Sequence, residues 1–211
     1  MRASARVVAV HTDGTTRLPV LCGQPPLLLR RTGPHGAVAV VYLVGGAAGP
    51  LGGDDLRLTV DVGPGARLVL RSVAAAVALP GPGNDASQIV VEATVAAGGR
   101  LDWRPEPLVA AAGCRHRARS QVTLAEGAEL TWQEALVCGR HGEQPGEATV
   151  ALTVTYAGRP LYQQESTVGT HAPGWAGPAV LDGARAVGST LYARPGRSDH
   201  RSRWCSPPPQ R

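Results

Sequence analysis

The chain has 211 residues, of which 43% are hydrophobic and 18% charged, a balance that is typical of one globular domain and excludes wholesale disorder. Its 27 glycines and 18 prolines exclude a helical bundle, because in a helix interior Gly costs about 1 kcal/mol and Pro about 3 kcal/mol relative to Ala. The net charge is +5, and all 21 Lys or Arg residues are Arg.

The N-terminal part of the chain carries no segment that resembles a signal peptide or a membrane helix. The apolar run at residues 7–10 is too short for a signal peptide, and the uncharged stretch 36–53 is interrupted by six glycines and Pro50. Four cysteines are too few for a dense disulfide framework. We therefore expect a reduced, cytoplasmic protein.

The glycine-rich run at residues 45–53 could suggest a phosphate-binding loop. It is followed by Asp54, Asp55 and a strand pattern instead of a helix N-terminus, so a phosphate would meet repulsion and no helix dipole. We interpret this run as structural.

Alternating apolar and polar residues predict a series of half-buried strands. Residues 72–79 fit a helix or a strand equally well, and 80–83 form a loop. We expect a single all-β domain over residues 1–195 and a flexible tail, rich in Arg and Pro, over 196–211. The clearest strand segments are 37–44, 56–62, 87–94, 131–138 and 149–156.

A repeat of about thirty residues organises the middle of the chain. Two alternating runs flank a glycine turn at Gly65, again at Gly98 and Gly127, and in a copy one residue shorter at Gly158. These glycines are 33, 29 and 31 residues apart. A glycine at such a turn accepts a positive φ, and each turn is interpreted as a hairpin or a tight corner. The period predicts an all-β fold of stacked strand-turn-strand units, β-helix-like or in layered sheets, with few short helices.

Sequence motifs for catalysis are missing. The chain has no Gly-x-Ser-x-Gly elbow, no His-Glu-x-x-His and, without Lys, no nucleotide-binding P-loop. Two Cys/His pairs, Cys114 with His116 and Cys138 with His141, could form a four-ligand metal site if they converged, but their spacing matches no standard zinc motif. Acidic residues with a conceivable metal role are Asp54, Asp55, Asp61, Glu134 and Glu143.

Four blocks of sequence lie in a specific order between residues 40 and 165. They are Gly52-Gly53-Asp54-Asp55 with the turn Gly63-Pro64-Gly65-Ala66, then Leu101-Asp102-Trp103-Arg104-Pro105-Glu106-Pro107, then the segment from Gly113-Cys114-Arg115 to Thr131-Trp132-Gln133-Glu134, and last Gly139-Arg140 with Gly142-Glu143. In this order the blocks resemble the UreD (UreH) family of urease accessory proteins. The chain departs from the family after the Gly-Pro-Gly-Ala turn, where Arg-Ser-Val-Ala-Ala-Ala-Val at residues 71–77 replaces a Thr-rich stretch with a Lys.

The resemblance implies a mostly β, non-enzymatic scaffold or chaperone for nickel insertion into urease. Family members bind apo-urease and form a complex with the accessory proteins UreF and UreG, in which UreG hydrolyses GTP. Nickel is thought to pass through the UreD-type protein, so we expect transient nickel and no tightly bound cofactor. Ligands that release nickel easily are needed. Our candidates for these transit contacts are Asp54, Asp61, Glu134 and His141.

Two alternative functions follow from the residues. A metal-dependent enzyme would use the Cys/His pairs, and a nucleic-acid-binding β module would use the basic charge. The arginines are scattered and few aromatic residues lie among them. We therefore favour genome composition as the origin of the charge, and we expect neither a nucleic-acid partner nor a membrane partner.

Overall fold

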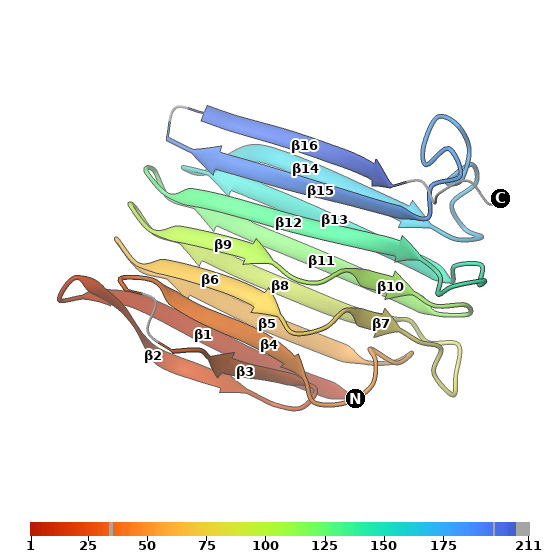
Figure 1. Cartoon of the computed structure of the whole chain (residues 1–211), viewed down its shortest axis with the longest axis horizontal. Coiled ribbons are helices and arrows are strands. Elements are labelled where there is room, and N and C mark those ends of the chain that lie inside the picture. Colours follow the sequence, from red (N-terminus) through yellow and green to blue (C-terminus); the bar gives the residue numbers. More distant parts are fainter. Residues whose placement is uncertain (34–35, 196, 206–211) are drawn as a thin grey trace.

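The computed structural model describes residues 1–33, 36–195 and 197–205, which form sixteen β-strands and no helix. The strands build two facing sheets, with the nine-stranded sheet in front in Figure 1. The all-β prediction is confirmed, although the few short helices that we expected are missing from the described part of the chain. No described segment is a helix long and apolar enough to cross a membrane.

The seven-stranded sheet has the spatial order β14 (Arg159–Val168), β13 (Glu147–Tyr156), β11 (Arg115–Leu124), β8 (Ser87–Val95), β5 (Asp55–Val62), β1 (Arg2–Thr12), β2 (Thr15–Gly23). The nine-stranded sheet has the order β16 (Arg197–Cys205), β15 (Ala186–Arg194), β12 (Glu129–Cys138), β9 (Arg100–Arg104), β6 (Arg67–Ser72), β4 (Ala39–Gly45), β3 (Leu27–Arg31), with β10 (Leu108–Ala110) beside β12 and β7 (Ala76–Ala78) beside β10.

The middle of the chain winds between the two sheets as a stack of coils. Each coil places one strand in the seven-stranded sheet and the next in the nine-stranded sheet, and equivalent strands pair in parallel (Figure 1). The register is continuous across coils, since Leu58 pairs with Val91, Val91 with Ser120, and Ser120 with Leu152. The thirty-residue repeat of the sequence is therefore one coil of a solenoid-like fold.

The corner glycines stack on one another at the turn between the sheets. Gly98 has a φ of 68°, and a Cβ added to it would lie 3.8 Å from the amide nitrogen of Gly65 in the neighbouring corner. Backbone N–H groups of one corner donate to the next, from Ala96 to the Val62 carbonyl (2.8 Å) and from Arg100 to the Ala66 carbonyl (2.8 Å). These bonds continue the sheet ladders around the corner.

Gly158 marks a different kind of turn from the other three glycines. It joins β13 to β14 in an antiparallel hairpin within one sheet, with φ of 47° at Ala157 and 74° at Gly158. Two consecutive positive φ values are typical of the two-residue type I′ hairpin turn, which explains why this copy of the repeat is one residue shorter. The parallel part of this sheet ends at the hairpin, as it ends on the other side at the antiparallel pair β1–β2.

Two hydrophobic cores fill the space between the sheets. The larger one runs along the coils and contains Trp103 and Trp132 from neighbouring strands, whose rings stack with centroids 5.1 Å apart. The smaller one lies where β7 and β10 join the nine-stranded sheet and contains Cys114, Leu136 and Cys138.

Two segments differ from the sequence prediction. Residues 72–79, which fitted helix and strand alike, leave β6 as an exposed bulge and then form the short strand β7. Part of the expected C-terminal tail forms β16, which pairs antiparallel with β15 along its whole length. The Arg- and Pro-rich composition of this segment predicted no strand. The strand forms because β15 supplies a pairing partner, which the local sequence does not indicate. Residues 206–211 lie outside the described residues.

Candidate functional site

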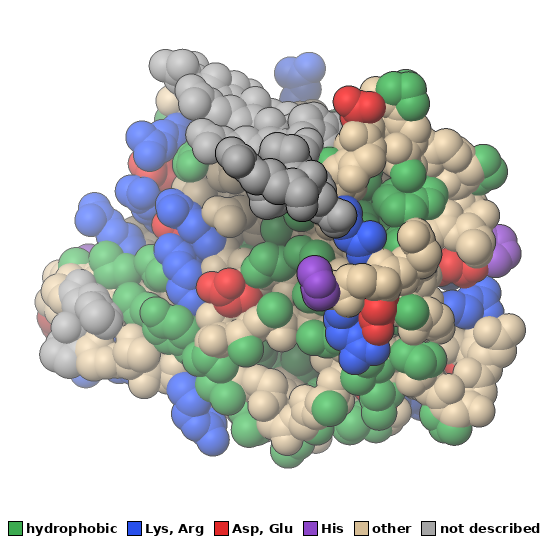
Figure 2. Space-filling view, turned by 45° about the vertical axis from the view of Figure 1, so that its right-hand side comes forward, with side chains coloured by type: hydrophobic (Ala, Val, Ile, Leu, Met, Phe, Trp, Pro, Cys, Tyr) green, Lys and Arg blue, Asp and Glu red, His purple; other side chains and the backbone are tan. Residues whose placement is uncertain are grey.

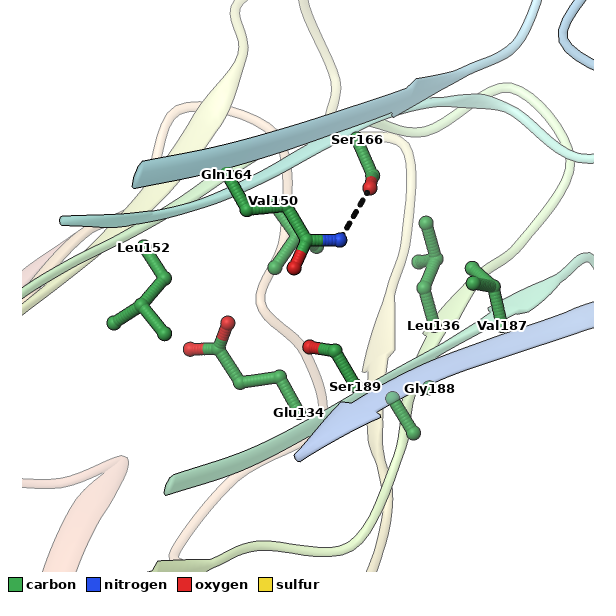
Figure 3. Close-up of a pocket in the computed structure, with 10 residues that line it drawn as sticks. Glu134, Leu136, Val150, Leu152, Gln164, Ser166, Val187, Gly188 and Ser189 are labelled. Carbon is green, nitrogen blue, oxygen red and sulfur yellow. Dashed lines mark hydrogen bonds between the residues drawn. The ribbon is translucent and has the colours of Figure 1, made fainter. Parts of the chain in front are cut away.

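A small cavity of about 30 Å³, lined by both polar and apolar side chains, lies between the two sheets near the β14 end of the stack (Figure 3). Glu134 and Ser189 face it from β12 and β15, and Gln164 and Ser166 face it from β14 (Figure 3). The cavity has room for about two water molecules. The apolar part of its lining is formed by Leu136, Val150, Leu152 and Val187.

Glu134 is the charged group of this cavity. In β12 it occupies the inward position between Trp132 and Leu136, which alternation reserves for apolar side chains. The Ser120 hydroxyl on β11 donates a hydrogen bond to its Oε1 at 2.7 Å. Burial raises the pKa of Glu134, and the Trp132 indole and the Ser120 hydroxyl oppose this rise.

A chain of polar groups on β14 faces Glu134 across the cavity. The Tyr162 hydroxyl donates to Oε1 of Gln164, and Nε2 of Gln164 donates to Oγ of Ser166 at 3.4 Å. Burial and the negative charge of Glu134 raise the pKa of Tyr162. Carboxylate, amide and hydroxyl oxygens are ligands that divalent cations accept, but one ionisable group gives only weak, reversible binding.

The four residues that we selected as nickel-transit contacts are not brought together. Asp54 is buried in the turn before β5, where it accepts from the Leu51 N–H (2.9 Å) and pairs with the Met1 ammonium (2.6 Å). Asp61 lies on the outer face of β5 and pairs with Arg6 at 2.9 Å. His141 is exposed in the turn after β12. Only Glu134 of the four faces the cavity (Figure 3).

The two Cys/His pairs do not converge either. Cys114 and Cys138 are buried in the smaller core, whereas His116 is buried on β11 and His141 is exposed. Burial and the Glu147 charge raise the pKa of Cys114 to about 11, so this thiol is a poor metal ligand at neutral pH. Across residues 1–33 and 36–195, no three His, Cys, Asp or Glu side chains are grouped so that they could hold a metal ion.

His116 has a structural environment. Its Nδ1 lies 2.8 Å from Oγ of Ser87, whose hydroxyl in turn donates to the Arg115 carbonyl at 3.3 Å, while Nε2 is buried without a partner among the described residues. Burial lowers the pKa of His116 to about 4. The side chain is therefore neutral at pH 7.

Sequence reasoning found Glu134 but missed the polar groups around it. Ser120 breaks the inward apolar pattern of β11, and Gln164 and Ser166 alternate with exposed residues on β14. These polar residues interrupt the apolar pattern of their strands, and the interruption can be recognised in the sequence. Their meeting at one cavity cannot be recognised there, because it depends on β14 folding back as a hairpin.

Comparison with known proteins places this geometry in context. The sequence model of the family described as UreD urease accessory protein matches residues 1–205. A protein of Parafrankia sp. (strain EAN1pec) named urease accessory protein UreD is 46% identical, over 92% of this chain and 73% of the relative. A protein of the same name from Streptomyces avermitilis is 46% identical, over 92% and 78%. Urease accessory protein UreD 3 of Streptomyces griseus is 48% identical, over 94% and 79%.

Proposed function

The chain belongs to the UreD family of urease accessory proteins, and we propose that it acts as a scaffold and chaperone in the incorporation of nickel into urease. As an accessory protein it is not itself an enzyme. Two broad sheet faces support this role. Because their strands are already ordered, little backbone entropy is lost when a partner binds to them.

The proposed partners are apo-urease and the accessory proteins UreF and UreG, in the cytoplasm. UreG supplies GTP hydrolysis in this proposal, consistent with the absence of a P-loop sequence in this chain. Nickel is then a cargo that this chain contacts in transit, and no tightly bound cofactor is proposed.

The observation that carries the nickel-transit proposal is the ionisable Glu134 in the inter-sheet cavity. A buried carboxylate attracts a divalent cation, and the surrounding hydroxyl and amide oxygens replace part of its hydration shell. With a single carboxylate the site holds nickel weakly and releases it. Asp61 and His141 remain proposed as contacts on the surface, and Asp54 as a contact near the β5 turn.

The test measures urease activation and nickel content in cells that express urease with UreF, UreG and this chain. We expect Glu134→Gln and Glu134→Ala to lower nickel per urease active site by about tenfold while the complex still forms. Glu165→Gln on the exposed side of β14 is the matched control and should leave loading unchanged. Asp61→Ala and His141→Ala, singly and with Glu134→Ala, test the surface contacts.

Full nickel loading in the Glu134 variants would refute the transit role of the cavity. Failure of the unaltered chain to co-purify with apo-urease, UreF or UreG would refute the scaffold role itself.

A further inference from the structure

The outer face of the nine-stranded sheet carries an excess of positive charge. Because side chains alternate along each strand, the residues beside the buried ones point outward. Figure 2 shows a line of blue side chains on the left of the view with few red ones among them. On the strands of this sheet other than β16, the outward charged residues are Arg30, Arg67, Arg71, Arg100, Arg104 and Arg194 against Asp102 and Glu129.

The strand register brings these arginines directly opposite one another. Arg71 pairs with Arg104 across β6 and β9, and Arg67 pairs with Arg100 at the other end of the same two strands. Like charges at directly opposed positions destabilise a sheet. Asp102 offsets the first pair, with its Oδ1 3.1 Å from Arg71 and 2.9 Å from Arg104.

Three arginines of this face are left without an acidic partner. Arg30, Arg67 and Arg194 are exposed and form no ion pair among the described side chains. Arg100 has only a distant partner, Glu129 at 3.6 Å. On the seven-stranded sheet Arg6 and Arg57 pair with acids on the same face, whereas Arg117 and Arg119 are exposed and form no ion pair among the described side chains.

An exposed apolar segment adjoins this charge. All four side chains of residues 73–76, Val-Ala-Ala-Ala, are exposed, and Val73 is 56% exposed. The segment is fixed in place, because the Val73 N–H donates to the Leu43 carbonyl (3.1 Å) and the Ser72 hydroxyl accepts from the Glu106 N–H (2.8 Å). A run of consecutive exposed apolar residues on a fixed backbone is unfavourable in an isolated protein and is typical of a contact surface.

We propose that this basic face, defined as Arg30, Arg67, Arg71, Arg100 and Arg104 with residues 73–76, docks a protein partner that presents acidic side chains around a small apolar centre. The proposal rests on the proposed function only in placing that partner in the urease-maturation assembly. Charge complementarity selects an acidic surface, and residues 73–76 select a protein over a nucleic acid, whose phosphates gain nothing from apolar contact.

The experiment compares two charge-matched variants of the full chain. Arg30→Glu with Arg67→Glu alters the basic face, and Arg117→Glu with Arg119→Glu alters two exposed arginines of β11 on the opposite sheet. The probes are purified apo-urease, UreF with UreG, and a short duplex DNA, each titrated at low and high salt. We expect the first variant to lose about tenfold in affinity for one protein probe, and the second to stay within about twofold.

A second variant addresses the apolar segment. Val73→Asp should weaken the same protein complex, whereas Val180→Asp, which alters another exposed valine, should not. Thermal melts of all variants confirm folding.

The outcomes separate the surface from the function. If the unaltered chain binds a protein probe and both charge variants bind it equally well or equally poorly, the basic face is not the docking surface. The scaffold role then still stands. If the unaltered chain binds DNA and the Arg30/Arg67 variant loses only that binding, the face is a nucleic-acid site and the proposal is overturned. If the unaltered chain binds no protein probe, the proposed function fails as well.

Discussion

At the scale of single residues, His116 and Glu134 are two ionisable side chains at inward strand positions suited to apolar ones, His116 buried and Glu134 partly buried. Glu134 keeps one hydrogen bond inside the sandwich, and His116 keeps one nitrogen without a partner among the described residues. Burying such groups costs free energy unless every polar atom is bonded. We expect each to leave a measurable mark on stability.

Glu134→Gln should stabilise the protein at neutral and alkaline pH. A buried carboxyl with a raised pKa is protonated more readily in the folded chain than in the unfolded one, so its contribution to stability falls as pH rises. The amide removes that penalty at almost the same volume. Urea unfolding at pH 4 and pH 8 measures the effect, which should grow with pH; a variant that is less stable than the parent at pH 8 would contradict the assignment.

His116 should make the protein sensitive to acid. Its folded pKa of about 4 lies below the unfolded value of 6.5, so the unfolded chain binds a proton that the folded chain excludes, and stability falls as pH drops from about 6.5 to 4. The loss attributable to this group is about 3 kcal/mol. The difference in unfolding free energy between the parent and His116→Asn, followed through this pH range, isolates it. A constant difference would show that His116 is not held neutral.

Thiol chemistry offers a further check at this scale. Cys22 is exposed, whereas Cys114 and Cys138 are buried and burial raises both pKa values. In the native protein we expect alkylation at Cys22 and protection of Cys114 and Cys138, with all three modified after unfolding. Peptide mass mapping reads each site separately, and rapid native labelling of Cys114 would overturn this packing.

The sequence predicted the chemical type of the candidate site residues, but not which of them lie at one site. Glu134 was identified because a family motif contains it, and the cavity now gives it a physical setting. Asp54 and Asp61 also lie in a family motif and His141 follows one, but the structure disperses these three to a turn, an outer face and an exposed loop. Sequence does not encode which face of a sheet meets which distant strand.

At the scale of elements, glycine is required for two different reasons. At the corners the backbone has a positive φ, and where two backbones lie close together there is no room for a Cβ. At Gly98 the positive φ is the constraint, and an added Cβ would meet nothing nearer than 3.8 Å. At Gly81 the constraint is space, because an added Cβ would lie 2.4 Å from the Gly52 carbonyl oxygen. The glycine-rich run that contains Gly52 is thus structural, as its sequence context indicated.

Gly98→Ala should cost about 1 kcal/mol, the penalty of a left-handed conformation for a residue with a Cβ. Gly81→Ala should cost about 2 to 3 kcal/mol, because two backbones must separate. Chemical denaturation of the two variants and the parent gives both numbers. Equal costs would contradict the distinction between conformation and space.

Strand prediction succeeded where pairing is regular and failed where it is not. The coils repeat at a fixed period, so β5, β8, β12 and β13 were expected close to their observed bounds. The hairpin at Gly158 was grouped with the corners because both need a glycine with positive φ. The sheet that the chain enters after such a turn is decided by the partner strand and not by the turn sequence.

At the scale of the whole molecule, a stack of parallel coils must be closed at both ends. Antiparallel strands perform this task, with β2 and β14 on one sheet and β3 and β16 on the other. An edge strand with as many charged residues as β16 disfavours further pairing with other chains. The charge is also arranged at this scale, with its excess on the outer face of one sheet.

A chain that stops at residue 195 should lose this closure on the nine-stranded sheet. Without β16 the backbone of β15 is unpaired along one side, so we expect a lower melting temperature and association that grows with concentration. Light scattering after size exclusion reports the mass. Thr190→Lys in the shortened chain, which adds a charge on β15, should reduce the association; a shortened chain that stays monomeric and equally stable would contradict this role of β16.

The stacked indoles of Trp103 and Trp132 give the interior an optical signature. Two aromatic rings 5.1 Å apart share their excited states, so the folded chain should show a pair of bands of opposite sign in its far-ultraviolet circular dichroism. Trp132 lies two residues from Glu134 on the same side of β12. A paramagnetic ion that reached the cavity would quench the indole emission, so the proposed transit of nickel could be followed in solution without any added label.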